Sequence, residues 1–348
     1  MLAEKYQDLG KPIAIHTSNA GFHSRWVTYC EQQGIPVKRV NCHDSDIIEQ
    51  LRSCQGLLWH HSQQDPADLL VAKAILAALE HTGFSVFPDW RTAWHFDDKV
   101  AQKYLLEAID APLVPSWVFL DLESALEWVG KTTFPKVFKL RGGAGSSNVR
   151  LVRNRGRARQ LVRKAFGAGF KNYDPWSGLK ERWLKFRMGR TGFLDVVKGV
   201  GRFFRAPPFA RTLGREAGYI YFQEFIGNND SDTRIIVING KAFALKRLVR
   251  DNDFRASGSG KFIYSQGEFD TRCVEIAFQI TERLGLQCGA YDFIFDEQND
   301  PLLVELSYGF VAEVYDDCPG YWDRSMRWHN GVFNPQGWMV DAFRNKVP

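Results

Sequence analysis

The chain has 348 residues, 45% of them hydrophobic and 24% charged, with a net charge of +5 at pH 7. No apolar run approaches the roughly 20 residues that span a membrane, and the polar start has no secretory signal pattern. The six cysteines form no CxxC pair, so the composition excludes a membrane-spanning protein and predicts a cytoplasmic one with reduced thiols and two or three globular domains.

The charge is distributed unevenly along the chain. Residues 150–215 contain eighteen Lys and Arg against three acids, a balance of +15, which leaves −10 for the remainder. The sequence therefore predicts an acidic body with one strongly basic segment.

The first ninety residues alternate between strand and helix patterns. Apolar runs lie at residues 12–16, 36–40, 56–59 and 84–87, and helical patterns at 22–33, 44–53 and 66–82. This alternation predicts a parallel sheet with helices packed on it. Ligands of such sheets bind beyond the carboxyl ends of the strands, which makes His16–Asn19 and His60–Gln64 a candidate substrate crevice. Because no nucleophile accompanies the histidines, we favour a structural role for His60 and His61.

A second, smaller α+β unit is expected from about residue 98. Residues 97–108 (DDKVAQKYLLEA) have helical spacing of apolar residues, with Asp97 or Asp98 as the N-cap. A strand at 112–120 and a helix at 123–130 follow.

A glycine-rich loop comes next in the chain. Strands at 136–140 and 148–152 flank residues 141–147, a loop of small residues with three glycines. Such a loop lets backbone N–H groups approach phosphate oxygens, and Lys139 supplies a point charge for the same anion. It matches neither the Walker loop nor the GxGxxG pattern, and an ordinary hairpin tip is an equal alternative.

The basic segment, residues 155–215, mixes Lys and Arg with bulky apolar side chains, above all within 179–204. This mixture suits a surface that binds anionic lipid headgroups or another polyanion, and nucleic acid is not expected. Four glycines between 189 and 201 argue against one long helix. The alternative is an insertion whose apolar face packs on the body.

From residue 219 the pattern is strand, strand, strand. A strand at 219–226 precedes a hairpin of 233–238 and 241–249 across Asn239–Gly240. The second strand of the hairpin is basic, and a helix is expected at 271–284.

A second hairpin combines strands at 291–295 and 302–306. Each strand carries one carboxylate in an apolar run, Asp292 and Glu305. A suitable register places both on one face, where a hard dication such as Mg²⁺ would relieve their repulsion and bring substrate phosphates with it. The alternative is a pair of edge-strand carboxylates that face water.

Residues 98–306, apart from 155–215, resemble the ATP-grasp ligases. The likeness is carried by FQEFI, DTRIIVINGKAFALKRLVRDNDFRAS and AYDFIFDEQNDPLLVELS, and it is nearest to the RimK-like carboxylate–amine ligases. The resemblance implies an ATP-grasp fold of the α/β and α+β class with an N-terminal parallel α/β domain. The expected divisions are residues 1–97, a central subdomain 98–218 with the basic insertion 155–215, and a C-terminal subdomain 219–348.

The resemblance also implies the roles of individual residues. The ATP phosphates would contact Lys99 and Lys139, and the loop with Gly142, Gly143, Gly145, Ser146 and Ser147 would close over them. The adenosine would lie against Gln223, Glu224, Phe225, Ile226 and Asp232. Catalysis would fall to Arg247, Lys246 and Arg255. Two Mg²⁺ ions would be held by Asp292, Glu305 and Ser307.

Two departures from the family pattern stand out. Ser307 replaces the usual Asn two residues after the metal-binding Glu, which puts the second metal position in doubt. The segment that follows is expanded and adds Glu313, Asp316 and Asp317. These acids would either take part in metal binding, shape an acceptor pocket or form a solvated loop.

The expected activity is that of an ATP- and Mg²⁺-dependent ligase that joins a carboxylate to an amine through an acyl phosphate. Its substrates would be small molecules, a sugar or polysaccharide precursor, or a peptide, and residues 155–215 would place the enzyme at the periphery of a membrane. The alternatives are a non-catalytic ATP-binding protein and a phosphotransferase that stops at the phosphorylated product.

Overall fold

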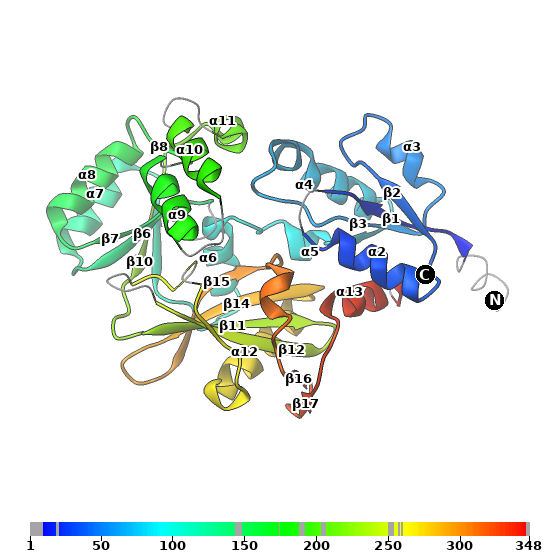
Figure 1. Cartoon of the computed structure of the whole chain (residues 1–348). Helices are drawn as coiled ribbons and strands as arrows, with labels where there is room; N and C mark the ends of the chain where they lie inside the picture. The colour runs from blue at the N-terminus through cyan, green and yellow to red at the C-terminus, as the bar shows by residue number, and fades with distance from the viewer. Residues whose placement is uncertain are drawn as a thin grey trace. The chain divides into compact units, whose positions relative to one another are not determined.

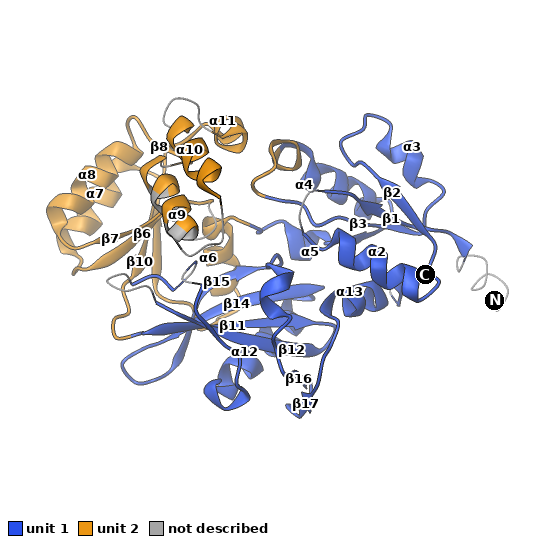
Figure 2. Ribbon diagram, in the orientation of Figure 1, with its two compact units in different colours: residues 1–62, 70–96, 229–348 blue, residues 63–69, 97–228 orange. Residues whose placement is uncertain are grey.

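The computed structural model describes residues 10–18, 21–142, 148–173, 175–187, 192–202, 207–249, 254–256, 258 and 260–345. They form two compact units (Figure 2): unit 1 comprises residues 1–62, 70–96 and 229–348, and unit 2 comprises 63–69 and 97–228. Within the described ranges, no helix has the length and apolar character needed to cross a bilayer.

Unit 1 contains the predicted N-terminal parallel sheet (Figure 1). Its strands are ordered β2-β1-β3-β4, with every pair parallel. The strands are β1 (Ile13–His16), β2 (Val37–Val40), β3 (Gly56–Leu58) and β4 (Ser85–Phe87), and the helices are α2 (His23–Gln32), α3 (Ile47–Leu51), α4 (Pro66–His81) and α5 (Trp90–Ala93). Ala14, Leu57 and Val86 of the sheet share a core with Leu76 of α4, so the prediction from alternating patterns is confirmed.

Unit 1 also contains a seven-stranded sheet ordered β15-β14-β11-β12-β16-β17, with β13 paired to β12. The strands are β11 (Ser231–Ile238), β12 (Lys241–Leu248), β13 (Phe262–Ile263), β14 (Cys288–Phe295), β15 (Pro301–Ser307), β16 (Gly320–Asp323) and β17 (Trp328–Asn330). Asn239 and Gly240 join β11 to β12 with φ of 49° and 69°, the backbone of the predicted tight hairpin turn.

The two faces of this sheet are covered differently. Helix α12 (Thr271–Leu284) packs on one face, where the Thr281 hydroxyl lies 2.6 Å from the Tyr291 hydroxyl. The other face places Ile236 and Phe243 in one core with Trp26 of α2 and Val340 of α13 (Pro335–Arg344). Short 3-10 helices lie at Gln266–Glu268 and Ala312–Tyr315. This shared core joins the two sheets into one unit.

Unit 2 is built on an antiparallel sheet of order β5-β10-β6-β7. The strands are β5 (Ser116–Phe119), β6 (Lys136–Lys139), β7 (Val149–Val152) and β10 (Ile220–Glu224), with helices α6 (Lys99–Glu107), α7 (Leu122–Lys131) and α8 (Arg155–Ala165). Phe138 and Phe222 pack one face of the sheet against Val129 of α7 and Leu161 of α8.

The insertion begins with α8, and its described residues contain two short paired strands and three further helices. They are β8 (Phe170–Lys171), β9 (Arg215–Glu216), α9 (Pro175–Arg187), α10 (Phe193–Gly201) and α11 (Pro208–Leu213). The expectation that this segment does not form one long helix is confirmed, because α9 ends at Arg187 and α10 begins at Phe193.

Candidate active site

Strand register gathers five charged residues on one face of the large sheet of unit 1. Asp232 lies directly opposite Arg247 across β11–β12, and Arg234 lies opposite Asp292 across β11–β14. Asp292 in turn faces Glu305 across β14–β15. Opposed residues share a face, and so do residues two apart on one strand. The register thereby places three carboxylates and two arginines together, next to the apolar core on the same face.

Arg247 lies at the centre of this cluster and is 6% exposed. Its Nε and Nη2 donate to the two oxygens of Asp232 at 2.6 and 2.7 Å, and Nη2 also lies 2.7 Å from Oδ2 of Asp292. Burial opposes the charge of Arg247, but the two carboxylates outweigh it and raise its pKa well above the usual value. Burial also raises the pKa of Asp232, against the opposing effect of Arg247. The guanidinium is a fixed, permanent positive charge.

Arg234 was not predicted as a site residue. Its Nε lies 3.4 Å from Oδ1 of Asp292, so Asp292 contacts two arginines. The alternation of β11 already places Arg234 on the same face as Asp232, but only the pairing of β11 with β14 shows that Asp292 is its partner.

The donor set suits a hard divalent cation. Asp292 and Glu305 carry carboxylate oxygens at directly opposed positions, and oxygen is the ligand that Mg²⁺ prefers; the oxygens of Asp292 also lie within ion-pair distance of Arg234 and Arg247. A bulge follows this pair, because Asp292 faces Glu305 whereas Phe293 faces Leu303. Ser307 lies two residues beyond Glu305, on the same face, where its hydroxyl donates to the carbonyl of Gly309 and accepts from its N–H, both at 3.1 Å. The structure therefore gives Ser307 a turn-closing role.

The other two predicted catalytic residues are placed differently. Lys246 on β12 and Phe293 on β14 both lie opposite Thr233 of β11. The Lys246 side chain is therefore on the face of the sheet that carries α12. Its Nζ lies 3.9 Å from Glu268. The structure does not bring Lys246 together with Arg247. Arg255 is half-buried in the short described segment 254–256.

In unit 2, the residues predicted to bind phosphates lie near one another. Lys139 at the end of β6 is buried, and Lys99 begins α6, which Asp98 caps by accepting from the N–H of Ala101. The backbone N–H of Lys99 donates to the carbonyl of Arg141 at 3.0 Å. A Cβ on Gly142 would lie 3.2 Å from Oδ2 of Asp97. The entry to the glycine-rich loop therefore packs against the start of α6.

The other residues predicted to contact the adenosine lie on or just after strand β10, except Asp232, which lies on β11 and binds Arg247. Gln223 lies on the same face of the sheet as Lys139, and its side-chain amide donates to the Ser116 hydroxyl at 3.1 Å. Glu224 accepts from Lys136 with both oxygens at 2.8 Å, which leaves its backbone for any ligand. The half-buried residues Phe225 and Ile226 follow. Gly143, Gly145, Ser146 and Ser147 lie outside the described residues.

The expanded loop after Ser307 is tied to helix α2. Arg25 contacts both oxygens of Asp316 at 2.6 and 2.7 Å and lies 3.9 Å from Glu313. These acids thus have a cationic partner of their own within unit 1. Of the candidate crevice histidines, His61 is buried, and His60 accepts from the N–H of Phe22 and stacks on its ring. Burial lowers the pKa of both to about 3, which agrees with structural roles.

Comparison with known proteins identifies the fold. Residues 211–313 match the family model of the RimK-like ATP-grasp domain. Among solved structures, the chain is similar to a RimK domain ATP-grasp protein from Sphaerobacter thermophilus, with 16% identity, a TM-score of 0.58, and 95% and 98% of the two chains covered. It is also similar to D-cycloserine synthetase DcsG, with 13% identity, a TM-score of 0.60 and coverage of 97% and 99%. D-alanine–D-alanine ligase from Bacillus anthracis, complexed with ATP, matches at 9% identity and a TM-score of 0.55, with coverage of 97% and 96%.

No curated protein matches the sequence significantly. The chain has the ATP-grasp fold, and the predicted fold class is confirmed. The predicted resemblance to RimK-like proteins is confirmed for the matched residues, which include Asp232, Arg247, Asp292 and Glu305.

Proposed function

We propose that this protein is an ATP- and Mg²⁺-dependent ligase that joins a carboxylate to an amine. The carboxylate oxygen attacks the γ-phosphorus of ATP and releases ADP, which gives an acyl phosphate. The amine nitrogen then attacks the carbonyl carbon and gives up a proton, and phosphate leaves with the electrons of the C–O bond. The fold and the RimK-like match of residues 211–313 support this reaction class.

One observation carries the proposal: Asp292 and Glu305 are directly opposed on the face that also presents Arg247. These carboxylates would hold Mg²⁺, which when bound neutralises charge on phosphate oxygens. Arg247 would stabilise negative charge that develops on the transferred group. Asp232 holds the guanidinium by both oxygens, so it would orient Arg247 rather than react.

The remaining proposed contacts are to the nucleotide. Lys99 and Lys139 would neutralise the phosphates, since both are buried cations beside the entry to the glycine-rich loop. Gln223 and the backbone after Glu224 would take the adenine. We assign no catalytic role to Lys246, because its side chain belongs to the opposite face of the sheet from Arg247.

An anionic acceptor is the substrate class that the charge distribution favours. The balance of +15 over residues 150–215 suits a sugar phosphate, a polysaccharide precursor or an acidic peptide. Addition of an amino acid to such an acceptor fits the reaction class.

ADP release from ATP and Mg²⁺ in the presence of pools of carboxylates and amines tests the proposal. Release should require both pools and fall at least about 100-fold in Glu305→Gln, because the amide cannot supply a charged ligand. Glu297→Gln, in the exposed turn of the same hairpin, is the matched control and should retain full activity. Full activity in Glu305→Gln would contradict the proposed Mg²⁺-dependent ligase.

A second candidate, a non-catalytic ATP-binding protein, is favoured by Ser307. Its hydroxyl is engaged with Gly309, and the family's usual Asn is absent at this position. This candidate predicts nucleotide binding without ADP release for every pool. Release that requires a carboxylate but no amine would instead indicate a phosphotransferase.

A further inference from the structure

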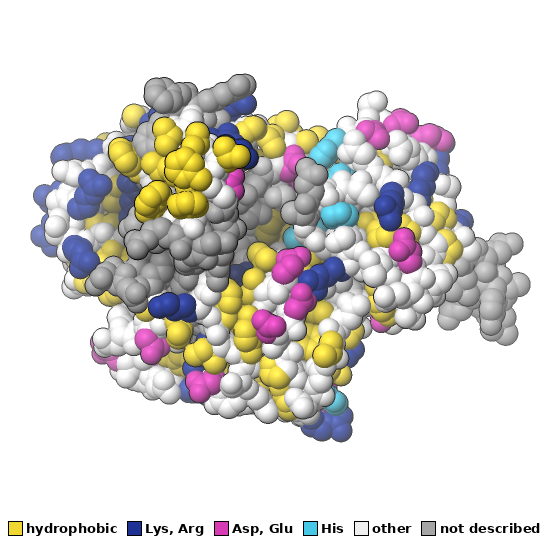
Figure 3. All heavy atoms as spheres, in the orientation of Figure 1, with side chains coloured by type: hydrophobic (Ala, Val, Ile, Leu, Met, Phe, Trp, Pro, Cys, Tyr) yellow, Lys and Arg dark blue, Asp and Glu magenta, His cyan; other side chains and the backbone are white. Residues whose placement is uncertain are grey.

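Helices α9 and α10 of unit 2 turn large apolar side chains toward solvent. Trp176 is 72% exposed, Phe193 59% and Leu194 75%. Trp183, Val197 and Val200 are exposed as well. Figure 3 shows apolar side chains gathered over these two helices. The alternative, an insertion whose apolar face packs on the body, does not describe these residues, because they are exposed.

The two helices meet through buried residues, and Phe186 and Phe193 add a ring contact between them. Helix α10 packs on α9 through Val196 and Gly199, where a Cβ on Gly199 would lie 3.0 Å from Cδ1 of Leu179. Arg182 adds a hydrogen bond to the carbonyl of Asp195 at 3.3 Å. The inner side of the helix pair is therefore packed, whereas its outer side leaves large apolar side chains exposed to solvent.

Ring contacts through the half-buried Phe186 link Trp183 of α9 to Phe193 of α10. The rings of Trp183 and Phe186 are 5.9 Å apart, and those of Phe186 and Phe193 are 5.7 Å apart. Leu194, Val197 and Val200 continue from Phe193 at helical spacing along α10. We call Trp176, Trp183, Phe186, Phe193, Leu194, Val197 and Val200 the apolar surface.

Positive charge lies on the same unit as the apolar surface. Helix α8 of unit 2 exposes Arg157, Arg159 and Arg163, and Figure 3 shows basic side chains on the same side of unit 2. The acid of α10, Asp195, lies within ion-pair distance of Arg182 and Lys198. Apolar side chains with basic residues nearby are complementary to a membrane, which has an apolar interior and anionic headgroups at its surface.

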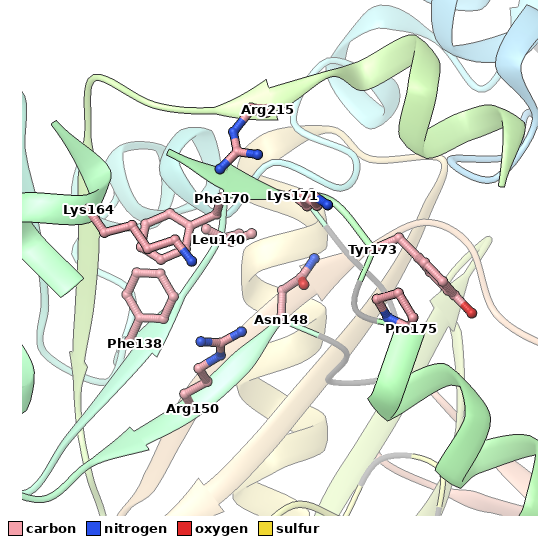
Figure 4. Close-up of a pocket in the computed structure, with 10 residues that line it drawn as sticks. All are labelled: Phe138, Leu140, Asn148, Arg150, Lys164, Phe170, Lys171, Tyr173, Pro175 and Arg215. Carbon is pink, nitrogen blue, oxygen red and sulfur yellow. The ribbon is translucent and has the colours of Figure 1, made fainter. Parts of the chain in front are cut away.

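A cationic pocket lies where α9 begins. It has a volume of about 190 Å³ and is lined by Arg150, Lys164, Lys171 and Arg215, with Pro175, the residue before Trp176, at its edge. In Figure 4 the basic side chains of this pocket surround one space together with Asn148. No carboxylate lines the pocket among the described residues. Four cations, with no carboxylate among the described lining residues, suit a phosphate group.

We propose that the apolar surface docks the protein on an anionic phospholipid bilayer, with the cationic pocket taking a headgroup phosphate. Trp and Phe side chains enter the interfacial region, where their rings leave water, while Arg and Lys remain at the level of the phosphates. Each cation near such a membrane strengthens binding by about five-fold, an attraction that salt screens. This docking does not depend on the reaction that the enzyme performs.

Co-sedimentation of the full chain with lipid vesicles tests the proposal. We expect binding to vesicles that contain phosphatidylglycerol, weak binding to phosphatidylcholine alone, and a loss of affinity as salt rises. The variant Phe193→Glu/Leu194→Glu should bind at least about ten-fold more weakly, because charge on the apolar surface opposes insertion. Val332→Glu, at a fully exposed apolar position of unit 1, should bind like the wild type. Arg150→Ala/Lys171→Ala should weaken binding by more than about ten-fold and reduce the salt dependence.

Circular dichroism melting of each variant confirms that loss of binding is not loss of fold. The proposal fails if the wild type remains unbound in anionic vesicles, or if both double variants bind as it does. Sedimentation velocity reveals a second copy as occupant: a dimer that Phe193→Glu/Leu194→Glu dissociates, without vesicle binding, would overturn the bilayer assignment. The bilayer assignment would also be overturned if calorimetry showed that the protein binds free glycerol phosphate while it does not bind vesicles.

Discussion

Arg247 on β12 donates two hydrogen bonds to Asp232 on β11, from Nε to Oδ1 at 2.6 Å and from Nη2 to Oδ2 at 2.7 Å. The planar fork of the guanidinium matches the carboxylate in this geometry. The same Nη2 reaches Asp292 at 2.7 Å. The orientation set by Asp232 therefore fixes where Arg247 meets the proposed metal carboxylate.

Arg247→Lys should lower the free energy of unfolding by about 2 kcal/mol, because an ammonium keeps the charge but cannot serve both carboxylates of a buried cluster. Urea unfolding measures the change. Arg39→Lys makes the same substitution in a solvent-exposed pair with Glu31 at 3.5 Å and should cost less than about 0.5 kcal/mol. Equal effects in the two variants would contradict a special role for the fork.

Ser307→Ala separates turn closure from metal binding. We expect unfolding to become about 1 kcal/mol easier, since the hydroxyl makes two hydrogen bonds to Gly309. The Mg²⁺ concentration that half-saturates ADP release should not change. A clear rise in that concentration would instead identify the Ser307 hydroxyl as a ligand of the ion.

Stability should fall as the pH drops below about 6.5. Burial lowers the pKa of His61 to about 3 and that of His95 to about 4, so the unfolded chain takes up protons that the folded chain does not. The stability is complete above the unfolded pKa and is lost as pH falls, by about 1 kcal/mol per histidine between pH 6.5 and 5.5 and by up to about 1.4 kcal/mol per pH unit below that.

Urea unfolding at a series of pH values checks this slope, which His61→Leu should reduce. No hydrogen-bond partner reaches Nε2 of His61 within the described chain, so the apolar side chain should be tolerated at pH 7.5. His81→Gln, at the exposed end of α4, is the control. A slope that survives His61→Leu undiminished would rule out this histidine as a source.

Gly240→Ala should destabilise the hairpin of β11 and β12 by about 1–2 kcal/mol, because a residue with a Cβ is strained at φ 69°. The added Cβ would also meet Nε of Arg324 at 2.4 Å. Thermal unfolding measures the loss. Gly267→Ala places a Cβ in open space and should be close to neutral, so matching losses at both sites would refute the argument.

Local chemistry made several elements predictable. Asp270 accepts from the N–H of Arg272 at the start of α12, and Gly285 ends the helix at φ 64°, so this helix lies where the sequence predicts it. Asn239–Gly240 marked the turn between β11 and β12. The apolar runs on either side of residues 296–300 likewise predicted the hairpin that opposes Asp292 to Glu305.

The sequence by itself determined many of the strands and helices and their order, because capping, turn geometry and alternation act over a few residues; the roles proposed for the site residues came from the family resemblance. Only the tertiary structure decided which distant elements meet. The pairing of β11 with β14 brings Arg234 to Asp292, 58 positions later, and the shared core of unit 1 allows Arg25 to hold Asp316. Only the tertiary structure shows that apolar side chains of α9 and α10 are exposed. Such contacts depend on which apolar surfaces of helices and sheets pack together. A local pattern along the chain does not specify this packing.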